Sequence, residues 1–237
     1  MAVRTGKDLR FYLDGYDLGL STTKVDMVMA STVLDATKYG DAAEVVVGGL
    51  RVDDQISWVG WFDDVAQGVD PFLGTGIGAT AVVSFVLGTA TGTAVGGRVY
   101  CGSALSVSAA PGGNVGELAR VVASIKPVGT LLPCIHYGLK QSRGSGGNSG
   151  TIDHGAGTTG TTVFFTHFFA GGTATGTLTL RHSADGTTFA AKGTVNYTGT
   201  GSQRTEFTGS LNRYTDTQWD PVVGLSSGTF FAAIRRP

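Results

Sequence analysis

Residues that carry redox chemistry, metal binding or strong charge are scarce in this chain. Its 237 residues include two cysteines and four histidines, and only 15% of its side chains are charged. Cys101 and Cys134 lie far apart, and no CxxC or Cys/His spacing occurs, so neither a disulfide framework nor a zinc site is indicated. We expect two free, buried thiols and a protein that needs neither a metal nor a cofactor.

Long hydrophobic segments are also missing. The longest unbroken apolar runs, such as residues 230–234, fall far short of the about 20 residues that a membrane helix requires. Residues 1–15 carry five charged side chains and lack the apolar centre of a signal peptide. We therefore expect a soluble protein that is made in a cytosol and has no membrane partner.

The remaining composition is typical of a β protein. Runs of Glu, Lys, Leu and Ala are absent, whereas 38 glycines accompany abundant Val, Thr and Ser. Residues 24–29 and 55–62 alternate polar and apolar side chains with the period of a half-buried strand. The fold is predicted to be all-β, with one short helix at residues 63–72, where Asp63 or Asp64 caps the helix and Pro71 ends it.

Periodicity divides the chain into two predicted domains. Residues 1–137 form a first sandwich or barrel, whose strands are predicted at 11–13, 24–29, 33–37, 44–47, 55–62, 79–87, 98–108 and 117–128. Residues 138–160 are rich in Gly, Ser and Thr, which is typical of a flexible linker or a long exposed loop. Strands resume at 161–169, 176–182, 189–197, 203–208 and 229–234, so residues 161–237 are predicted to form a second, small β-sandwich.

Charge is distributed unevenly between the two ends of the sequence. Residues 1–70 hold 12 acidic and 6 basic side chains, whereas the rest holds 6 acidic and 11 basic ones. The acidic surplus fits a solvated face, a surface that does not hold polyanions, or an acidic face that meets a basic one in an assembly. No basic patch of the kind that binds nucleic acid is evident.

No set of catalytic or ligand-binding groups can be assembled from the spacing of residues. The glycines of residues 74–78 lack the following helix and lysine of a phosphate loop, and the four histidines occur singly. No serine stands in a nucleophile elbow, and the pairs Asp53-Asp54 and Asp63-Asp64 lack the spacing of a calcium loop. We therefore predict no catalytic, cofactor-binding or metal-binding residues, and no enzymatic activity.

Aromatic residues are the best candidates for contacts between chains. Alternation places Trp58 and Trp61 on opposite faces of one strand, so one belongs in a core and the other is exposed or covered by a neighbour. With Phe62 they form our candidate assembly contact. The doublets Phe164-Phe165 and Phe168-Phe169 are each expected to place one ring in a core and the other at an interface.

Several stretches resemble a known family. The order FYLDGYDLG, VDMVMAS, LDATKYGD, VVVGGLRVDDQISWVGWFDD and GGRVYCGSALSVS resembles the tail tube (major tail) proteins of long-tailed, non-contractile bacteriophages, over residues 9–128. The positions that match the family's pattern are Leu34, Asp35, Thr37, Gly40, Asp41, Gly49, Leu50, Ile56, Gly60, Phe62 and Asp63. The second half departs from that pattern and resembles small β-sandwich modules appended to phage structural proteins.

The resemblance implies a virion protein whose β-sandwich domains form rings of six copies, stacked into a tube through which genomic DNA passes without specific binding. Its partners would be copies of itself and other phage tail proteins, and it would be made in the host cytoplasm. An acidic lining would repel the phosphates of DNA. Our candidates for such a lining are Asp14, Asp17, Asp41, Asp53 and Asp54.

Two other functions stay open at this point. The chain could be a capsid decoration or stabilising protein, which would bind capsids without stacking on itself. It could also be an adhesin whose second domain stacks glycans on Phe165, Tyr197, Tyr214 or Trp219.

Overall fold

The computed structural model describes residues 9–35, 46–62, 69, 73, 77–86, 95–114, 117–144, 146–169, 175–223 and 227–237. Strands dominate these residues, which confirms the all-β prediction. Within the described ranges only Val69 and Leu73 are helical. The rest of the short helix predicted at residues 63–72 lies outside them.

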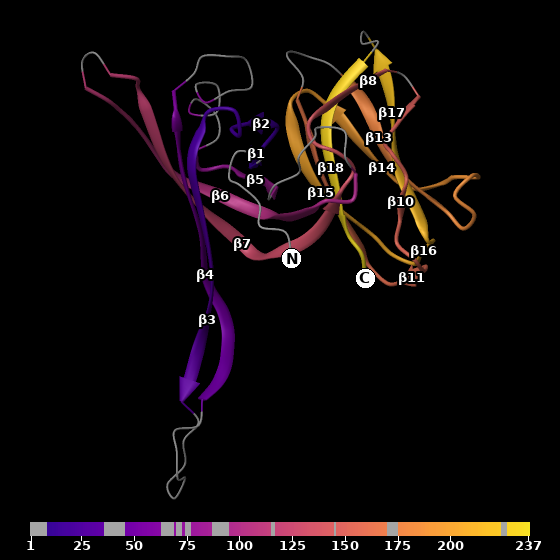
Figure 1. Cartoon of the computed structure of the whole chain (residues 1–237), viewed down its shortest axis with the longest axis horizontal. Coiled ribbons are helices and arrows are strands. Elements are labelled where there is room, and N and C mark those ends of the chain that lie inside the picture. The colour runs from indigo at the N-terminus through magenta and orange to yellow at the C-terminus, as the bar shows by residue number, and fades with distance from the viewer. Residues whose placement is uncertain are drawn as a thin grey trace, which may run out of the picture.

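The strands of the first half belong to one antiparallel system (Figure 1). They are β1 (Arg10–Leu13), β2 (Tyr16–Asp17), β3 (Thr22–Asp35), β4 (Val46–Trp61), β5 (Thr80–Val86), β6 (Arg98–Gly112) and β7 (Arg120–His136). The strands run β7-β6-β5-β1-β2 across the sheet, with β4 also paired to β7 and β3 paired to β4.

The second half contributes short strands followed by longer ones. They are β8 (Gln141–Gly144), β9 (Gly147–Asn148), β10 (Ile152–Asp153), β11 (Thr158–Thr159), β12 (Thr162–Phe168), β13 (Thr175–Ser183), β14 (Ala190–Thr198), β15 (Gly201–Phe207), β16 (Ser210–Leu211), β17 (Tyr214–Val223) and β18 (Ser227–Arg235). The order β15-β12-β18 continues the large sheet, with β8 also on β18, while β10-β17-β13-β14, with β9 also on β17, forms a second sheet and β11-β16 a third.

The turn between β1 and β2 follows directly from its sequence. Leu13 pairs with Tyr16 across the two-residue loop Asp14-Gly15. Both loop residues have positive φ angles, 47° and 76°, which is the backbone that Asp-Gly hairpin loops favour. The hairpin predicted at this position is confirmed.

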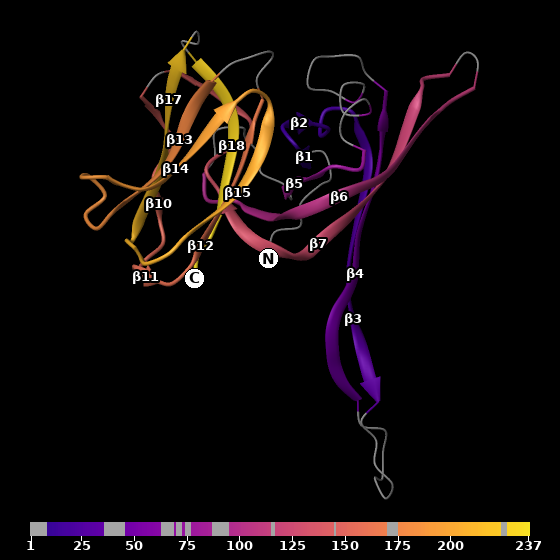
Figure 2. The same cartoon turned by 180° about the vertical axis from the view of Figure 1, so that it is seen from behind.

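Strand β7 joins the two halves of the molecule. Its first residues pair with β4, and its last two, Ile135 and His136, pair with Ile234 and Ala233 of β18. One sheet therefore runs from the first half into the second (Figures 1 and 2).

The expectation of a flexible linker or long loop at residues 138–160 is wrong for the described part of this segment, because it contains β8, β9, β10 and β11, paired with β18, β17 and β16. Strands of two to four residues are too short to show a period in the sequence. The division into domains at these boundaries stays a prediction.

Three apolar clusters stabilise this arrangement. One lies beneath β4 and β7, one lies between the sheets of the second half around Trp219, and one joins the halves around Tyr12 and Phe231. Cys101 and Cys134 are free and buried in the joining cluster, as predicted.

The phenylalanine doublets differ from the prediction, because all four rings are buried. Strand β12 lies between β15 and β18 and is packed on both faces. Phe164 and Phe168 belong to the cluster around Trp219, whereas Phe165 and Phe169 belong to the joining cluster. Neither doublet supplies an interface residue.

A long two-stranded ribbon extends from the body of the molecule (Figures 1 and 2). Strands β3 and β4 are each continuous where the sequence suggested two shorter strands, and shifts of register interrupt their pairing three times. Because β4 pairs with β7 only from Ile56 to Trp61, residues 28–35 and 46–55 lie beyond the rest of the sheet. We call these residues the arm.

Candidate assembly surface

The sheet portion formed by β3, β4, β7 and β6 has one covered face. Ile56 and Trp58 of β4 pair with Ile125 and Ala123 of β7, and all four side chains are buried in the same cluster. The indole Nε1 of Trp58 donates a hydrogen bond to Thr22 Oγ1 at 2.7 Å. Trp58 is therefore a core residue, and its prediction as an assembly contact is wrong.

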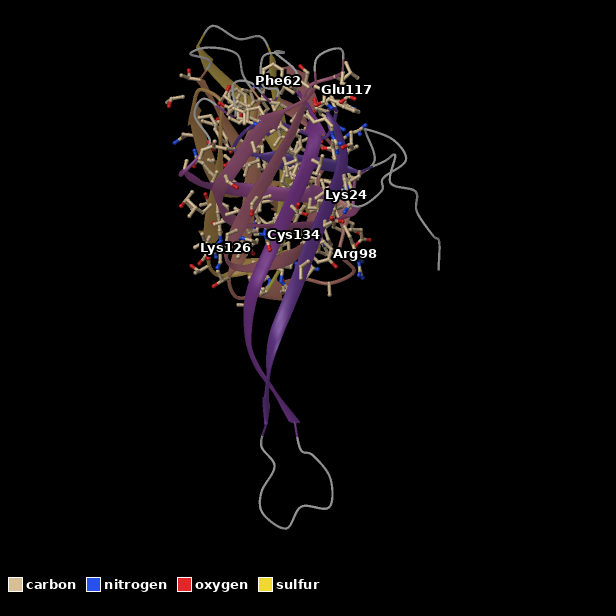
Figure 3. The ribbon with its side chains drawn as sticks, turned by 90° about the vertical axis from the view of Figure 1, so that its left-hand side faces the viewer. Lys24, Phe62, Arg98, Glu117, Lys126 and Cys134 are labelled. Atoms are coloured by element: carbon tan, nitrogen blue, oxygen red, sulfur yellow. The ribbon has the colours of Figure 1, made fainter. Side chains whose placement is uncertain are left out.

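The opposite face of these strands is uncovered by the described residues, and we call it the open face (Figure 3). Ser57, Ser124 and Ser108 pair across three strands and form a row of hydroxyls. Gln55 Nε2 donates to Ser124 Oγ at 3.3 Å. Next to this row, Lys24 and Asp26 of β3 form an exposed ion pair at 2.6 Å, of the kind that contributes little to folding.

The open face is bounded by two free edges. Among the described residues β3 pairs only with β4, so its other edge is unpaired. On the far side, β6 pairs with β5 only as far as Leu105, and the carbonyl of Ser106 accepts a hydrogen bond from the Gly78 N–H at 2.9 Å. Residues 108–112 pair with β7 and with no other described strand. Unpaired N–H and C=O groups along such edges are templates for strands of other chains.

Exposed apolar side chains gather where β4 ends and β7 begins. Trp61 is 40% exposed, Phe62 39%, Val122 48% and Leu118 71%. The Phe62 N–H donates to the carbonyl of Ala119 at 2.9 Å, so the residues that follow β4 lie beside those that precede β7. We call Trp61, Phe62, Leu118, Arg120 and Val122 the rim patch.

Arg120 adds charge to the rim patch. Its guanidinium lies 5.9 Å from the centre of the Trp61 ring, within the range of a cation–π contact. The exposure of Trp61 confirms the alternation predicted for the two tryptophans. Arg120 and Val122 could not be predicted from the sequence as neighbours of Trp61, because the pairing of β7 with β4 places Arg120 opposite Trp61 and Val122 opposite Val59.

The acidic residues proposed to line a channel have different environments. Asp17 is 7% exposed and lies 3.4 Å from the ammonium of Lys140, and burial raises the pKa of its carboxyl. Asp14 accepts a hydrogen bond from Ser202 Oγ at 3.0 Å. Both carboxylates contact residues of the second half. Asp17 is too buried to line a channel, whereas Asp14 is partly exposed and stays a candidate. Asp53 and Asp54 lie in the arm, and Asp41 lies outside the described residues.

The side chains proposed to stack glycans are mostly inaccessible. Phe165, Tyr197 and Trp219 are buried, because each sits on a strand of the large or second sheet and points into a cluster. Only Tyr214 is partly exposed, and the guanidinium of Arg213 lies 4.8 Å from its ring centre. The prediction of a glycan-stacking surface is therefore wrong for three of its four residues.

The histidines do not assemble a reactive site. His167 is buried in the joining cluster, where desolvation lowers its pKa to about 3. The Nε2 atom of His154 is hydrogen-bonded to Thr215 Oγ1 at 2.8 Å. Desolvation lowers the pKa of the His154 imidazole to about 4. The part of the chain that the structure describes contains no cluster of three or more His, Cys, Asp and Glu side chains able to hold a metal ion, and no helix there is long and apolar enough to cross a membrane.

Comparison with known proteins returns matches only among solved structures. No family model matches the chain, and no curated protein matches it. A chain in the virion of a native gene transfer agent particle is 18% identical, with a TM-score of 0.44, over 55% of this chain and 98% of the other. A chain in the tail of an empty gene transfer agent particle, of C6 symmetry, has the same identity and coverage and a TM-score of 0.45.

A third match is the Dit protein of SPP1, described as a paradigm of the hub adsorption apparatus in phages that infect Gram-positive bacteria. It is 13% identical to this chain, over 96% of this chain and 99% of its own length, with a TM-score of 0.37.

Proposed function

We propose that this chain is a structural protein of a phage tail that assembles into stacked rings around a channel for genomic DNA. The observation that carries the proposal is the four-stranded open face bounded by two free edges. The family resemblance of residues 9–128 agrees with it. In this proposal the protein is a virion component made in the host cytoplasm, its partners are further copies and other tail proteins, and it performs no catalysis.

Ring closure follows from the two edges. If the free edge of β3 in one copy pairs with residues 108–112 of the next, each copy makes the same head-to-tail contact, and a cyclic ring leaves neither of these two edges open. The core beneath β4 and β7 covers one face of the sheet, so the bulk of each chain must lie outside the ring. The open face then lines the channel.

The described part of this lining carries serine hydroxyls, charges of both signs and the exposed apolar side chains of Val28, Trp61 and Val122. Lys24 is paired with Asp26, Arg120 lies against Trp61, and Ser57, Ser108 and Ser124 separate them from Lys126. Few cations are free to hold phosphates, so DNA contact is expected to be weak. Asp53 and Asp54 of the arm stay our candidates for an acidic section.

Cross-linking across the proposed edge contact tests ring formation. In the double variant Lys24→Cys/Ala110→Cys, a short bismaleimide should produce a ladder of covalent oligomers that ends at the ring number, six by the resemblance. Each single variant is the matched control and should give no ladder, because Cys101 and Cys134 are buried. Negative-stain images of the wild type should show rings or tubes.

A protein that stays monomeric at every concentration would refute this function. Binding to preformed capsids without self-association would favour the decoration alternative instead.

A further inference from the structure

The two free edges of the sheet have a fixed relative direction. Strand β3 is antiparallel to β4, β4 to β7, and β7 to β6, so β6 runs opposite to β3. In a ring, where copies are related by rotation, residues 108–112 of one copy are therefore antiparallel to β3 of the next. The end of this segment at Gly112 lies beside the start of β3 at Thr22. The turn that follows Gly112 then meets the residues that precede Thr22.

Backbone pairing alone specifies this edge contact poorly. Residues 108–112 are Ser, Ala, Ala, Pro and Gly, so the segment has no large side chain that would select one register. Pro111 has no N–H group and cannot donate a hydrogen bond across the edge. Register is weakly specified in such strands. Side chains outside the segment must therefore fix how neighbouring copies align.

A hollow of about 480 Å³ lies at the start of β3. Its lining consists of Leu9, Arg10, Gly19, Leu20 and residues 22–25. Leu20 is 76% exposed, more than any other large apolar side chain of the described residues. Arg10 Nη1 donates to the Leu9 carbonyl at 3.1 Å, and no described carboxylate lies within ion-pair distance of the Arg10 guanidinium. The hollow thus offers an uncovered apolar side chain beside a positive charge.

The turn between β6 and β7 carries the complementary side chains. Leu118 is 71% exposed, second only to Leu20 among the large apolar side chains described. The Glu117 N–H donates to the Asn114 carbonyl at 3.1 Å, and Asn114 Nδ2 donates to Glu117 Oε2 at 3.0 Å. The Glu117 side chain is exposed at one end of the molecule (Figure 3), and no described cation lies within ion-pair distance of its carboxylate. An apolar side chain and a negative charge therefore stand next to each other.

We propose that Leu118 of one copy enters the hollow of the next copy in the same ring and covers Leu20, that Glu117 pairs with Arg10, and that this contact fixes the register between copies. The proposal rests on the proposed function, because it needs the two edges to meet. Each copy has the leucine on one side and the hollow on the other, as a head-to-tail contact requires. Burial of the two leucines supplies most of the stabilisation, since an exposed ion pair contributes little.

A pair of cysteines tests the contact directly. In the double variant Leu20→Cys/Leu118→Cys, the short bismaleimide should give a ladder of covalent oligomers that ends at the same number as the Lys24→Cys/Ala110→Cys ladder. Neither single variant should give one, because Leu118 meets Leu20 of the next copy and not another Leu118. The matched control is Leu20→Cys/Val128→Cys, which should give no ladder, because Val128 is 56% exposed on β7 but lies away from the turn.

Reversal of the charges separates the contact from folding. Arg10→Glu and Glu117→Arg each place like charges opposite each other, and each should raise the protein concentration needed for half-maximal ring formation by about two- to fivefold. The double variant Arg10→Glu/Glu117→Arg should restore the wild-type value. Leu118→Ser should raise this concentration about tenfold or more, whereas Val128→Ser should leave it unchanged. Analytical ultracentrifugation over a concentration series measures all five variants.

The two cysteine pairs together give the deciding result. A ladder from Lys24→Cys/Ala110→Cys without one from Leu20→Cys/Leu118→Cys would overturn the inference while leaving ring formation intact. A Leu118→Ser variant that forms rings at the wild-type concentration would overturn it as well. A wild type without rings, together with no ladder from either cysteine pair, refutes the proposed function instead.

Discussion

The imidazole of His167 and the hydroxyl of Ser84 lie 2.9 Å apart, although 83 residues separate them in the sequence. The Gly15 N–H donates to Nδ1 of the same ring at 3.3 Å, so Nε2 carries the proton and donates to Ser84. The Ser84 hydroxyl also lies 3.3 Å from the Cys101 sulfur. This buried chain connects the β1–β2 turn, β5, β6 and β12, and it holds the two halves together.

Acid is expected to weaken this junction through His167. Burial lowers the pKa of its imidazole from 6.5 to about 3, so the stability that the neutral ring contributes is present above pH 6.5 and is lost as the pH falls toward 3. At pH 4.5 the loss is about 2 to 3 kcal/mol. Urea unfolding at pH 7.5 and 4.5 measures it. His167→Gln cannot titrate, and its stability should fall less over the same interval; an identical fall would count against the assignment.

The two tryptophans of β4 are a matched pair for separating folding from assembly. Trp58 is fully buried and Trp61 is 40% exposed. Trp58→Ala should lower the free energy of unfolding by about 3 to 5 kcal/mol. Trp61→Ala should change it by no more than about 0.5 kcal/mol and weaken self-assembly instead. Chemical denaturation at a concentration where the protein is monomeric distinguishes the two variants. Equal destabilisation by both would contradict the difference in burial between Trp58 and Trp61.

Gly176 and Gly228 both lie too close to the Trp219 indole to carry a side chain. A methyl group on Gly176 or on Gly228 would overlap the Trp219 indole, whereas one on Gly112 would meet nothing within 4 Å. Gly176→Ala and Gly228→Ala should each destabilise the fold by about 1 to 3 kcal/mol through overpacking. Gly112→Ala is the control and should be nearly neutral. Thermal unfolding ranks the three, and a neutral Gly176→Ala would show that the indole can move aside.

Removal of the Lys140 ammonium should leave the Asp17 carboxylate buried without its opposite charge, and so lower the free energy of unfolding. Asp17 is 7% exposed and pairs with Lys140 at 3.4 Å, and its pKa is raised chiefly by burial. Lys140→Met should destabilise the fold by about 1 to 3 kcal/mol at pH 7. A carboxyl with a raised pKa is favoured in its protonated form, so the loss should shrink as the pH falls.

The double variant Asp17→Asn/Lys140→Met is the control for this pair and should recover part of the stability at pH 7. If instead Asp17 lined a channel, Lys140→Met would leave the unfolding free energy unchanged.

Local rules predicted those elements whose side chains alternate or whose turns have a required residue type. The β1–β2 hairpin was readable because Asp14-Gly15 supplies positive φ angles. Strand β17 was missed, because its buried positions Thr215 and Thr217 are polar and give no apolar period. Gly60 is one of the positions that match the family pattern. The structure explains why glycine is needed there, because a methyl group on Gly60 would overlap the Trp58 ring.

The candidate site was only partly readable from the sequence. Alternation predicted that one tryptophan of β4 is exposed, but the neighbours of Trp61 come from β7, about 60 residues further along the chain. The sequence shows the net negative charge of residues 1–70. It does not show which of these carboxylates are exposed, because Asp17 is paired with Lys140 from the second half.

The sequence by itself determined the all-β class, the buried free cysteines and the tight turns, because side-chain periodicity and backbone preference act over a few residues. The tertiary structure alone decided that β7 and β18 join the two halves, which carboxylates are buried, and that the arm and the rim patch lie at opposite ends of β4. Those features depend on pairing between distant strands, and the register of such pairing is set by the packing of whole faces.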